Sequence, residues 1–234
     1  LCLVQDGRKV FLHGTEEPDS NRLYLSRVFA ELKLPVAQEA EECQALLAHH
    51  GLVYCSLSQC NPALDHQIQL RRLFALRSPA NTVARMLNPS HARHSFHGVF
   101  HKHFDVRHVQ TAKLNGDPSV ACIRGEGGEV EVNPERPFTQ YLLKDDNICE
   151  YAFPALLDNW QIKPRELNIQ ELEQVWCGTL DFDYADKAVV GTLASYLVLL
   201  ETLTPEHALL KAESLWQQRD TMPFCEWFEV SRKP

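Results

Sequence analysis

Residues 119–131 read Ser-Val-Ala-Cys-Ile-Arg-Gly-Glu-Gly-Gly-Glu-Val-Glu, an apolar run that stops in a loop of three glycines and three carboxylates. The apolar part has the composition of a buried β-strand. Glycines let the backbone turn tightly and approach a ligand, and carboxylate oxygens suit a hard cation such as Mg²⁺. Ligands of open α/β sheets bind beyond the carboxyl ends of strands, so this loop is a candidate site. A plain glycine-rich, acidic turn is the alternative.

The residues before this run predict how its strand is connected. Phe96–Phe100 reads as a strand, Asp105–Leu114 as a helix that stops before Gly116, and Ser119–Ile123 as the next strand. A strand, helix and strand in succession predict a parallel pair joined by a right-handed crossover.

The same patterns continue on both sides. Towards the N-terminus we expect strands at Arg8–Gly14 and Leu52–Leu57 and helices at Asn21–Leu32 and Gln38–His50. Towards the C-terminus we expect a hairpin of Thr139–Leu143 and Ile148–Phe153, then helices at Ile169–Leu180, Asp186–Leu200 and Pro205–Arg219. The predicted fold class is α/β, with a mostly parallel sheet flanked by helices.

Residues 61–88 are helical in pattern, with an interruption at Ser78-Pro79, because the residue before proline resists the α conformation. We therefore expect residues 61–90 to belong to a small helical subdomain, and residues 1–60 and 91–234 to form the α/β domain.

Composition limits the class of protein. No apolar run approaches the roughly 20 residues of a membrane span, and no signal peptide is recognisable. The eight cysteines form no CxxC pair, which favours reduced thiols in the cytoplasm. Because the first residue is Leu1 and the chain opens in the middle of an apolar pattern, we expect the first part of a longer protein to lie outside this sequence.

The formal net charge of −8 hides a basic stretch. Residues 71–113 hold eight Lys and Arg against one acid, Asp105, together with six of the 11 histidines. Such a stretch attracts phosphates, so DNA or RNA is the expected partner. The candidate nucleic-acid-binding residues are Arg71, Arg72, Arg77, Arg85, Arg93 and Lys102. A solvated arginine face is the plainer interpretation.

The histidines His91, His94, His97, His101, His103 and His108 are close in sequence. A strand at Phe96–Phe100 would place His97 and His101 on one face, and only Asp105 is near enough in sequence to complete a zinc site. We favour a phosphate-attracting histidine surface over a metal cluster.

Four short segments, taken in order along the chain, resemble motifs of glycosyltransferase family 3, specifically of the anthranilate phosphoribosyltransferases and their YbiB-type relatives. The resemblance rests on partial matches to the family's KHGN, R-T-x-x-N…N-P and H-G-E-G-G-x-D-E motifs and to its C-terminal helix. The matching residues are Leu12-His13-Gly14-Thr15, then Arg77-Ser78, Asn81 and Asn88-Pro89, then Gly125–Glu131, and finally Val189-Val190-Gly191-Thr192.

The resemblance implies enzymes that join phosphoribosyl pyrophosphate (PRPP) to anthranilate with Mg²⁺ in tryptophan synthesis. It also implies a homodimer formed through the helical subdomain, and an N-terminal helical segment and first strand that lie outside this sequence. Arg77 matches the arginine that contacts anthranilate, and His13 and Gly14 match the shared substrate motif.

The departures from the family pattern concern phosphate and metal binding. Val130 stands at the aspartate of the paired Asp-Glu that holds Mg²⁺, which leaves Glu131 as the weak metal candidate, and alternation would place Glu129 and Glu131 on one face. Leu12 and Thr15 replace a lysine and an asparagine, and Asp19-Ser20 replaces a phosphate-binding Ser-Ser pair. The family's GTGGD loop would precede Leu1.

The YbiB-type branch resembles the fold but lacks these catalytic residues, and its members look like dimeric nucleic-acid binders. We therefore predict a non-catalytic, cytoplasmic nucleic-acid-binding protein with degraded PRPP and Mg²⁺ sites. One alternative is a PRPP-dependent phosphoribosyltransferase completed by a further N-terminal segment, which would use Mg²⁺ and PRPP. Another is a small-molecule sensor that uses the pocket around His13 and Arg77.

Overall fold

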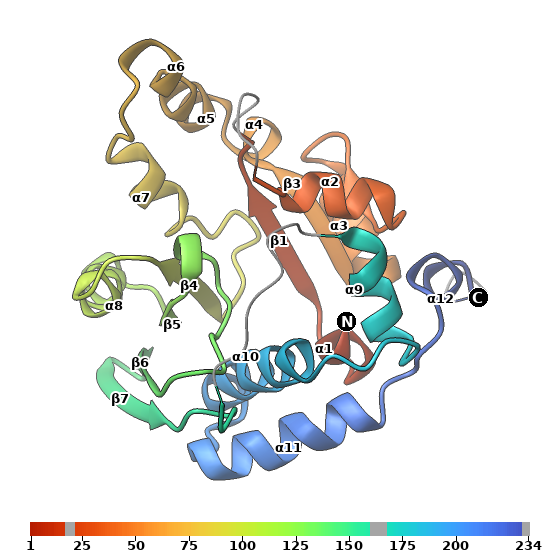
Figure 1. The fold of residues 1–234 in the computed structure, drawn as a ribbon. Helices are drawn as coiled ribbons and strands as arrows, with labels where there is room; N and C mark the ends of the chain where they lie inside the picture. The colour runs from red at the N-terminus through yellow and green to blue at the C-terminus, as the bar shows by residue number, and fades with distance from the viewer. Residues whose placement is uncertain (17–21, 160–167, 231–234) are drawn as a thin grey trace. The chain divides into compact units, whose positions relative to one another are not determined.

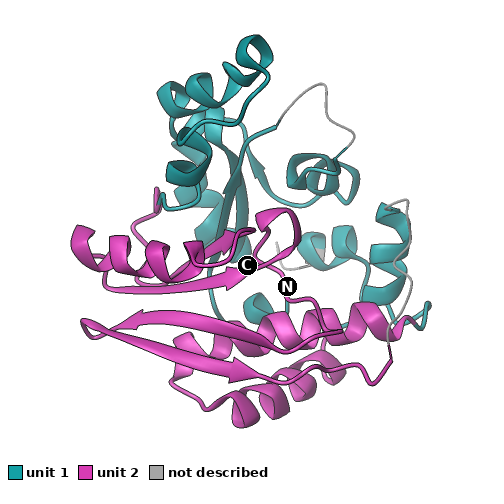
Figure 2. Cartoon of the chain, turned by 60° about the vertical axis from the view of Figure 1, so that its left-hand side comes forward, with its two compact units in different colours: residues 1–87, 164–181, 220–234 teal, residues 88–163, 182–219 magenta. Residues whose placement is uncertain are grey.

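The structure is a computed structural model that describes residues 1–16, 22–159 and 168–230 (Figure 1). The chain divides into two compact units, shown in different colours in Figure 2. Unit 1 contains Leu1–Leu87, Pro164–Asp181 and Asp220–Pro234. Unit 2 contains Asn88–Lys163 and Phe182–Arg219.

The sheet of unit 1 is parallel and three-stranded. Strands β1 (Val10–Gly14), β3 (Leu52–Ser56) and β2 (Val36–Ala37) lie in the order β1-β3-β2. The central strand β3 is buried on both faces, which is why its sequence is almost wholly apolar.

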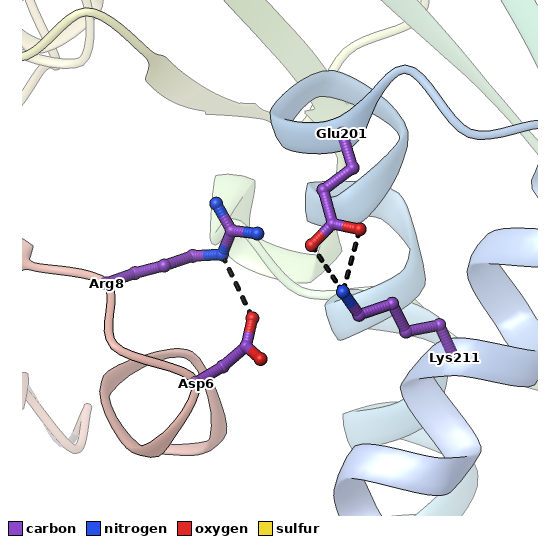
Figure 3. Close-up of polar contacts among 4 residues, drawn as sticks. All are labelled: Asp6, Arg8, Glu201 and Lys211. Carbon is purple, nitrogen blue, oxygen red and sulfur yellow. Dashed lines mark hydrogen bonds and ion pairs between the residues drawn. The ribbon is translucent and has the colours of Figure 1, made fainter.

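Different residues of β3 pack in two separate hydrophobic clusters. In the first, Leu52 and Tyr54 pack with Phe29 of α2 (Leu25–Glu31) and Phe228 of α12 (Phe224–Val230). In the second, Val53 and Cys55 pack with apolar residues of α3 (Glu42–His50). The short helix α1 (Cys2–Gln5) precedes the sheet, and its turn carries an ion pair between Asp6 and Arg8 (Figure 3).

Four short helices follow β3. They are α4 (Leu57–Cys60), α5 (Pro62–Gln69), α6 (Arg71–Phe74) and α7 (Ala80–Ala84), and their core is formed by Leu57, Ile68 and Ala80. The expected break at Ser78-Pro79 lies just before α7. A second break, which the sequence does not predict, falls at Ala75, whose φ of 55° ends α6 in the left-handed region. The assignment of residues 61–90 to a subdomain stays a prediction.

The sheet of unit 2 is four-stranded and mixed. Strands β4 (Ser95–Val99), β5 (Ser119–Arg124), β6 (Phe138–Lys144) and β7 (Asn147–Phe153) lie in sequence order. The β4·β5 pair is parallel, as expected for a crossover through α8 (Phe104–Asn115), and the β6·β7 pair is the expected hairpin. The β5·β6 pair is antiparallel. The predicted α/β class is confirmed, and most of the described strand pairings are parallel.

Helices flank this sheet, as Figure 2 shows for unit 2. Val120 and Cys122 of β5 pack with Val109 and Ala112 of α8. The long helix α10 (Asp183–Glu201) also contacts β5 and β6, and there the buried side-chain amide of Gln140 donates to the carbonyl of Ser195 at 3.0 Å.

Helix α11 (Pro205–Gln217) packs along α10. Its Lys211 donates to both carboxylate oxygens of Glu201, at 2.6 and 2.8 Å (Figure 3). No single helix in the described ranges is long and apolar enough to cross a membrane. The bent pair α10 and α11, at 118° to each other, passes that length and composition test only when the two are joined.

The remaining helix, α9 (Ile169–Trp176), belongs to unit 1, where its Trp176 indole donates to the carbonyl of Met222 at 3.0 Å. All eight cysteines are free thiols in the structure. Elements that the sequence patterns miss are α1, α4, α12 and the two-residue strand β2.

Candidate functional site

The loop that follows β5 is folded tightly against the ends of two strands. A short 3₁₀ turn (η1, Glu126–Gly128) begins after Gly125, and Gly127 and Gly128 adopt φ values of 65° and 82°. A Cβ placed on Gly98 of β4 would lie 2.3 Å from the carbonyl oxygen of Gly128. A Cβ on Gly125 would lie 2.1 Å from the carbonyl oxygen of Glu129. Glycine is therefore required at both positions, because the colliding atoms are backbone.

Two side chains of helix α10 form hydrogen bonds with the backbone of the second half of this loop. The hydroxyl of Tyr196 donates to the carbonyl of Val130 at 2.8 Å, and the amide of Val132 donates to the hydroxyl of Thr192 at 2.9 Å. Thr192 and Tyr196 are four residues apart, so they lie on one face of the helix. The Tyr196 ring also packs on Phe96 of β4, with ring centroids 4.4 Å apart.

The environment of Tyr196 keeps its hydroxyl protonated. Burial raises the pKa of Tyr196, and the carboxylate of Glu131 raises that pKa further. Tyr196 therefore remains a hydrogen-bond donor to the loop at every physiological pH.

The carboxylates of the loop lie at its surface. Glu129 and Glu131 are exposed, whereas Val130 between them is half-buried. Among the residues that the structure describes, no three His, Cys, Asp or Glu side chains are grouped so as to hold a metal ion. Mg²⁺, however, often takes only one or two protein carboxylates and keeps its other ligands as water or phosphate. Glu131 thus stays a weak metal candidate.

His13 lies at the carboxyl end of β1 in unit 1. Its Nε2 is 3.2 Å from the carbonyl oxygen of Leu87. Burial lowers the pKa of His13, and the hydrogen bond to Leu87 opposes this in part. Next to it, the hydroxyl of Tyr54 donates to the carbonyl of Gly14 at 3.3 Å. At the carboxyl end of β1, the lowered pKa therefore favours a neutral His13 side chain, and both His13 and the Gly14 carbonyl are engaged in hydrogen bonds.

The residues that follow this strand end are held by α5. The hydroxyl of Thr15 donates to Asp65, and the side-chain amide of Gln69 donates to the carbonyl of Glu16 at 2.8 Å. Leu12, where the resembling family has lysine, packs in the apolar cluster of β3. The Asp19-Ser20 pair lies outside the described residues.

Arg77 is exposed on the segment between α6 and α7. The turn after it is ordered by side chains, since Asn81 accepts from the amide of Ser78 at 3.3 Å. In unit 2, the side chain of Asn88 bonds both the carbonyl and the amide of Ala92. Among the described residues, the interactions of His13 are with the carbonyl of Leu87 and the ring of Phe11, and none is with Arg77.

The basic stretch is largely at the surface. Arg72, Arg77, Arg93 and Lys102 are exposed, whereas Arg71 and Arg85 are half-buried. Its only acid, Asp105, is 5% exposed and accepts a hydrogen bond from the amide of Val106. Arg72, Arg93 and Lys102 have no ion-pair partner among the described residues.

The prediction of a histidine surface is wrong in part. His97 and His108 are each 2% exposed, and their rings meet edge to face 5.6 Å apart between β4 and α8. His101 lies beyond the end of β4, so it does not share a strand face with His97. Only His91, His101 and His103 of the six are exposed.

Thr192 and Tyr196 are contacts of the loop that sequence reasoning does not find. Their spacing of four on an apolar helix is the available signal, but it does not identify the segment that they bind. The sequence also does not predict a cavity of about 300 Å³ beside α10 and α11, where the Trp216 indole donates to Asp186 at 3.1 Å and Arg219 stacks on the same ring.

Fold and loop together define an α/β protein with the fold of the anthranilate phosphoribosyltransferases. The enzyme from Saccharomyces cerevisiae in complex with PRPP and Mg superposes with a TM-score of 0.69 and 16% identity, over 99% of this chain and 68% of that one. Its Ser121Ala variant with Mg bound gives a TM-score of 0.67 at 14% identity, over 95% and 73%.

Proteins with a similar sequence are also anthranilate phosphoribosyltransferases. The anthranilate phosphoribosyltransferase of Halalkalibacterium halodurans is 23% identical over 216 residues, which are 89% of this chain and 60% of that protein. The one from Nitratidesulfovibrio vulgaris is 27% identical over 146 residues, or 62% and 43%. The chain thus spans 43–60% of the length of these two relatives. No family model matches it. The chain is thus similar in sequence and in fold to anthranilate phosphoribosyltransferases, and its placement in the YbiB-type branch stays a prediction.

Proposed function

We propose that this chain belongs to a nucleic-acid-binding protein of the YbiB type, built on the phosphoribosyltransferase fold and without its transfer reaction. The observation that carries this proposal is the charge of residues 71–113. The exposed side chains there include Arg72, Arg93 and Lys102, and the only carboxylate of the stretch, Asp105, is buried. Cations without neutralising partners attract phosphate oxygens of a nucleic acid without regard to base sequence.

The loop after β5 supports the same proposal. Val130 offers no oxygen from its side chain, and its carbonyl is already bonded to Tyr196. The carboxylates of the loop are those of Glu126, Glu129 and Glu131, and all three are exposed. At the two adjacent positions where the resembling family has aspartate and glutamate, only Glu131 carries a carboxylate here, so we expect that pair of positions to bind Mg²⁺ more weakly.

Titration of the full-length protein with a labelled oligonucleotide tests the proposal. Replacing Arg72, Arg93 and Lys102 with glutamine should weaken binding by a similar factor for every sequence. Arg136→Gln is the matched control, since Arg136 is exposed and lies in the acidic part of the chain. Binding that is absent in the wild type, or unchanged in the triple variant, contradicts the proposal.

A PRPP-dependent transferase is the second candidate, and the names of the relatives favour it. It is tested by heating the full-length protein with PRPP and Mg²⁺, since a ligand that binds only the native state raises Tm. A clear rise would support the transferase. If Val130 is the missing ligand, Val130→Asp should respond to Mg²⁺ with a larger rise in Tm than the wild type, whereas the uncharged Val130→Asn should not.

The proposed protein forms a homodimer through residues 61–90. Support comes from large apolar side chains that are exposed there, with Leu73 at 77%, Phe74 at 67% and Leu76 at 74%. Exposed apolar groups in this number on adjacent residues are typical of an interface. Sedimentation of Leu73→Glu, compared with the wild type, tests the dimer, which should dissociate in the variant. A monomeric wild type would contradict it.

A further inference from the structure

The turn between β4 and α8 exposes two aromatic rings. Phe100 follows the last residue of β4 and is 58% exposed, and Phe104 begins α8 and is 38% exposed. Exposing rings of this size to water is unfavourable, at roughly 25 cal/mol for each Å² of apolar surface. Rings at the end of a strand that otherwise enters a packed core therefore suggest a bound partner.

The rings lie in a chain of contacts. The Phe100 and His101 rings meet edge to face at 5.2 Å between centroids, and the His101 and Phe104 rings are 6.0 Å apart. The guanidinium carbon of Arg107, one turn further along α8, is 5.6 Å from the centre of the Phe104 ring. A further flat ring can therefore add to aromatic side chains that already support one another.

The charge of the same turn is positive. His101, Lys102, His103 and Arg107 are all exposed, and the only carboxylate in residues 100–113 is the buried Asp105. Lys102 has no ion-pair partner among the described residues. Flat apolar rings beside such cations match a ligand that offers aromatic faces and negative charge together.

We propose that residues 100–107, the Phe100 turn, bind single-stranded nucleic acid by stacking a base on Phe100 while Lys102 and Arg107 contact phosphates. This inference rests on the proposed function and names the form of nucleic acid that is bound. Stacking on aromatic side chains is tolerant of sequence because every base has a π-face. A duplex does not offer those faces, since its bases are stacked on each other, so the Phe100 turn prefers single strands.

Fluorescence anisotropy with the full-length protein tests this. The probes are a labelled oligo-dT of about 12 nucleotides, within the site sizes of single-strand binders, and a duplex of the same length. Phe100→Ala should weaken oligo-dT binding by roughly 5-fold or more, as the loss of one base stack predicts, and should change duplex binding much less. Phe100→Trp should retain wild-type affinity.

The control is Leu114→Ala, because Leu114 is an exposed apolar residue near the end of the same helix. Crosslinking of 5-iodouridine oligonucleotides gives a second measurement, which should place the crosslink in the peptide that contains Phe100. If Phe100→Ala binds oligo-dT like the wild type, and Arg72→Gln with Arg93→Gln weakens it, the Phe100 turn is excluded and the proposed function stands. If the wild type binds neither probe, the proposed function itself fails. Crosslinks that map elsewhere also overturn the assignment.

Discussion

The hydroxyl of Tyr196 on α10 donates a 2.8 Å hydrogen bond to the carbonyl oxygen of Val130, 66 residues earlier in the chain. This bond fixes the backbone at the position where the resembling family carries an aspartate. Together with the bond from the Val132 amide to Thr192, it makes the loop after β5 part of the packing between sheet and helix.

Tyr196→Phe should lower the free energy of unfolding by about 1 kcal/mol, because it leaves the part-buried carbonyl of Val130 without its donor. The urea midpoint measures this change. Tyr151→Phe is the control, since Tyr151 is half-buried and its hydroxyl makes no hydrogen bond to the described residues. Equal losses in the two variants would show that the bond to Val130 contributes nothing.

Gly98→Ala and Gly125→Ala should each destabilise the protein by about 1–3 kcal/mol, the usual cost of overpacking. In both variants the new Cβ would collide with backbone oxygen atoms of the loop, which cannot move aside as a flexible side chain does. Thermal unfolding measures the loss.

Gly14→Ala provides the comparison for these two variants. Its Cβ would meet only the Tyr54 ring and hydroxyl, at 3.5 Å or more, and should be tolerated. A Gly98→Ala protein as stable as Gly14→Ala would contradict the close approach of the loop to β4.

His13 should make the protein sensitive to mild acid. Burial lowers the pKa of His13 in the folded state, so below its ordinary value of 6.5 the unfolded chain binds a proton that the folded chain does not. Stability from His13 is therefore fully present above about pH 6.5 and is lost progressively as the pH falls from that value towards the lower pKa of the folded state.

His13→Asn removes this titration. Its free energy of unfolding should fall less than that of the wild type between about pH 7.5 and about pH 5.5. Urea titrations at the two pH values measure the difference. His91→Asn, at an exposed histidine, should behave like the wild type. Parallel losses in all three proteins would rule out His13 as the source.

The order of helices and strands can be predicted from the local sequence more fully than the contacts between distant residues can. Ser119–Ile123 is predictable as a strand because burial on both faces requires an unbroken apolar run, and Gly116 marks the end of the helix before it. β2 has only two residues, too few to show alternation.

Long-range contacts need the folded chain. The partners of Thr192 and Tyr196 lie 60 and 66 residues away, and no periodicity encodes such a distance. Burial of charged and polar residues is hidden for the same reason. Asp105 and His97 are ordinary polar residues in the sequence, and the packing of α8 on β4, β5 and β6 removes them from water.

The salt dependence of nucleic-acid binding should report how many cations touch phosphate. Each phosphate neutralised on a single strand contributes about −0.7 to the slope of log K against log salt concentration. Replacing Arg72, Arg93 and Lys102 together should therefore make the slope shallower by up to about 2 for oligo-dT, if all three contact phosphates. Phe100→Ala should weaken binding while leaving the slope unchanged, because a base stack releases no counterions. Anisotropy titrations between about 50 and 200 mM salt measure both slopes. Arg136→Gln should match the wild type, and an unchanged slope in the triple variant would show that these three cations do not contact the strand.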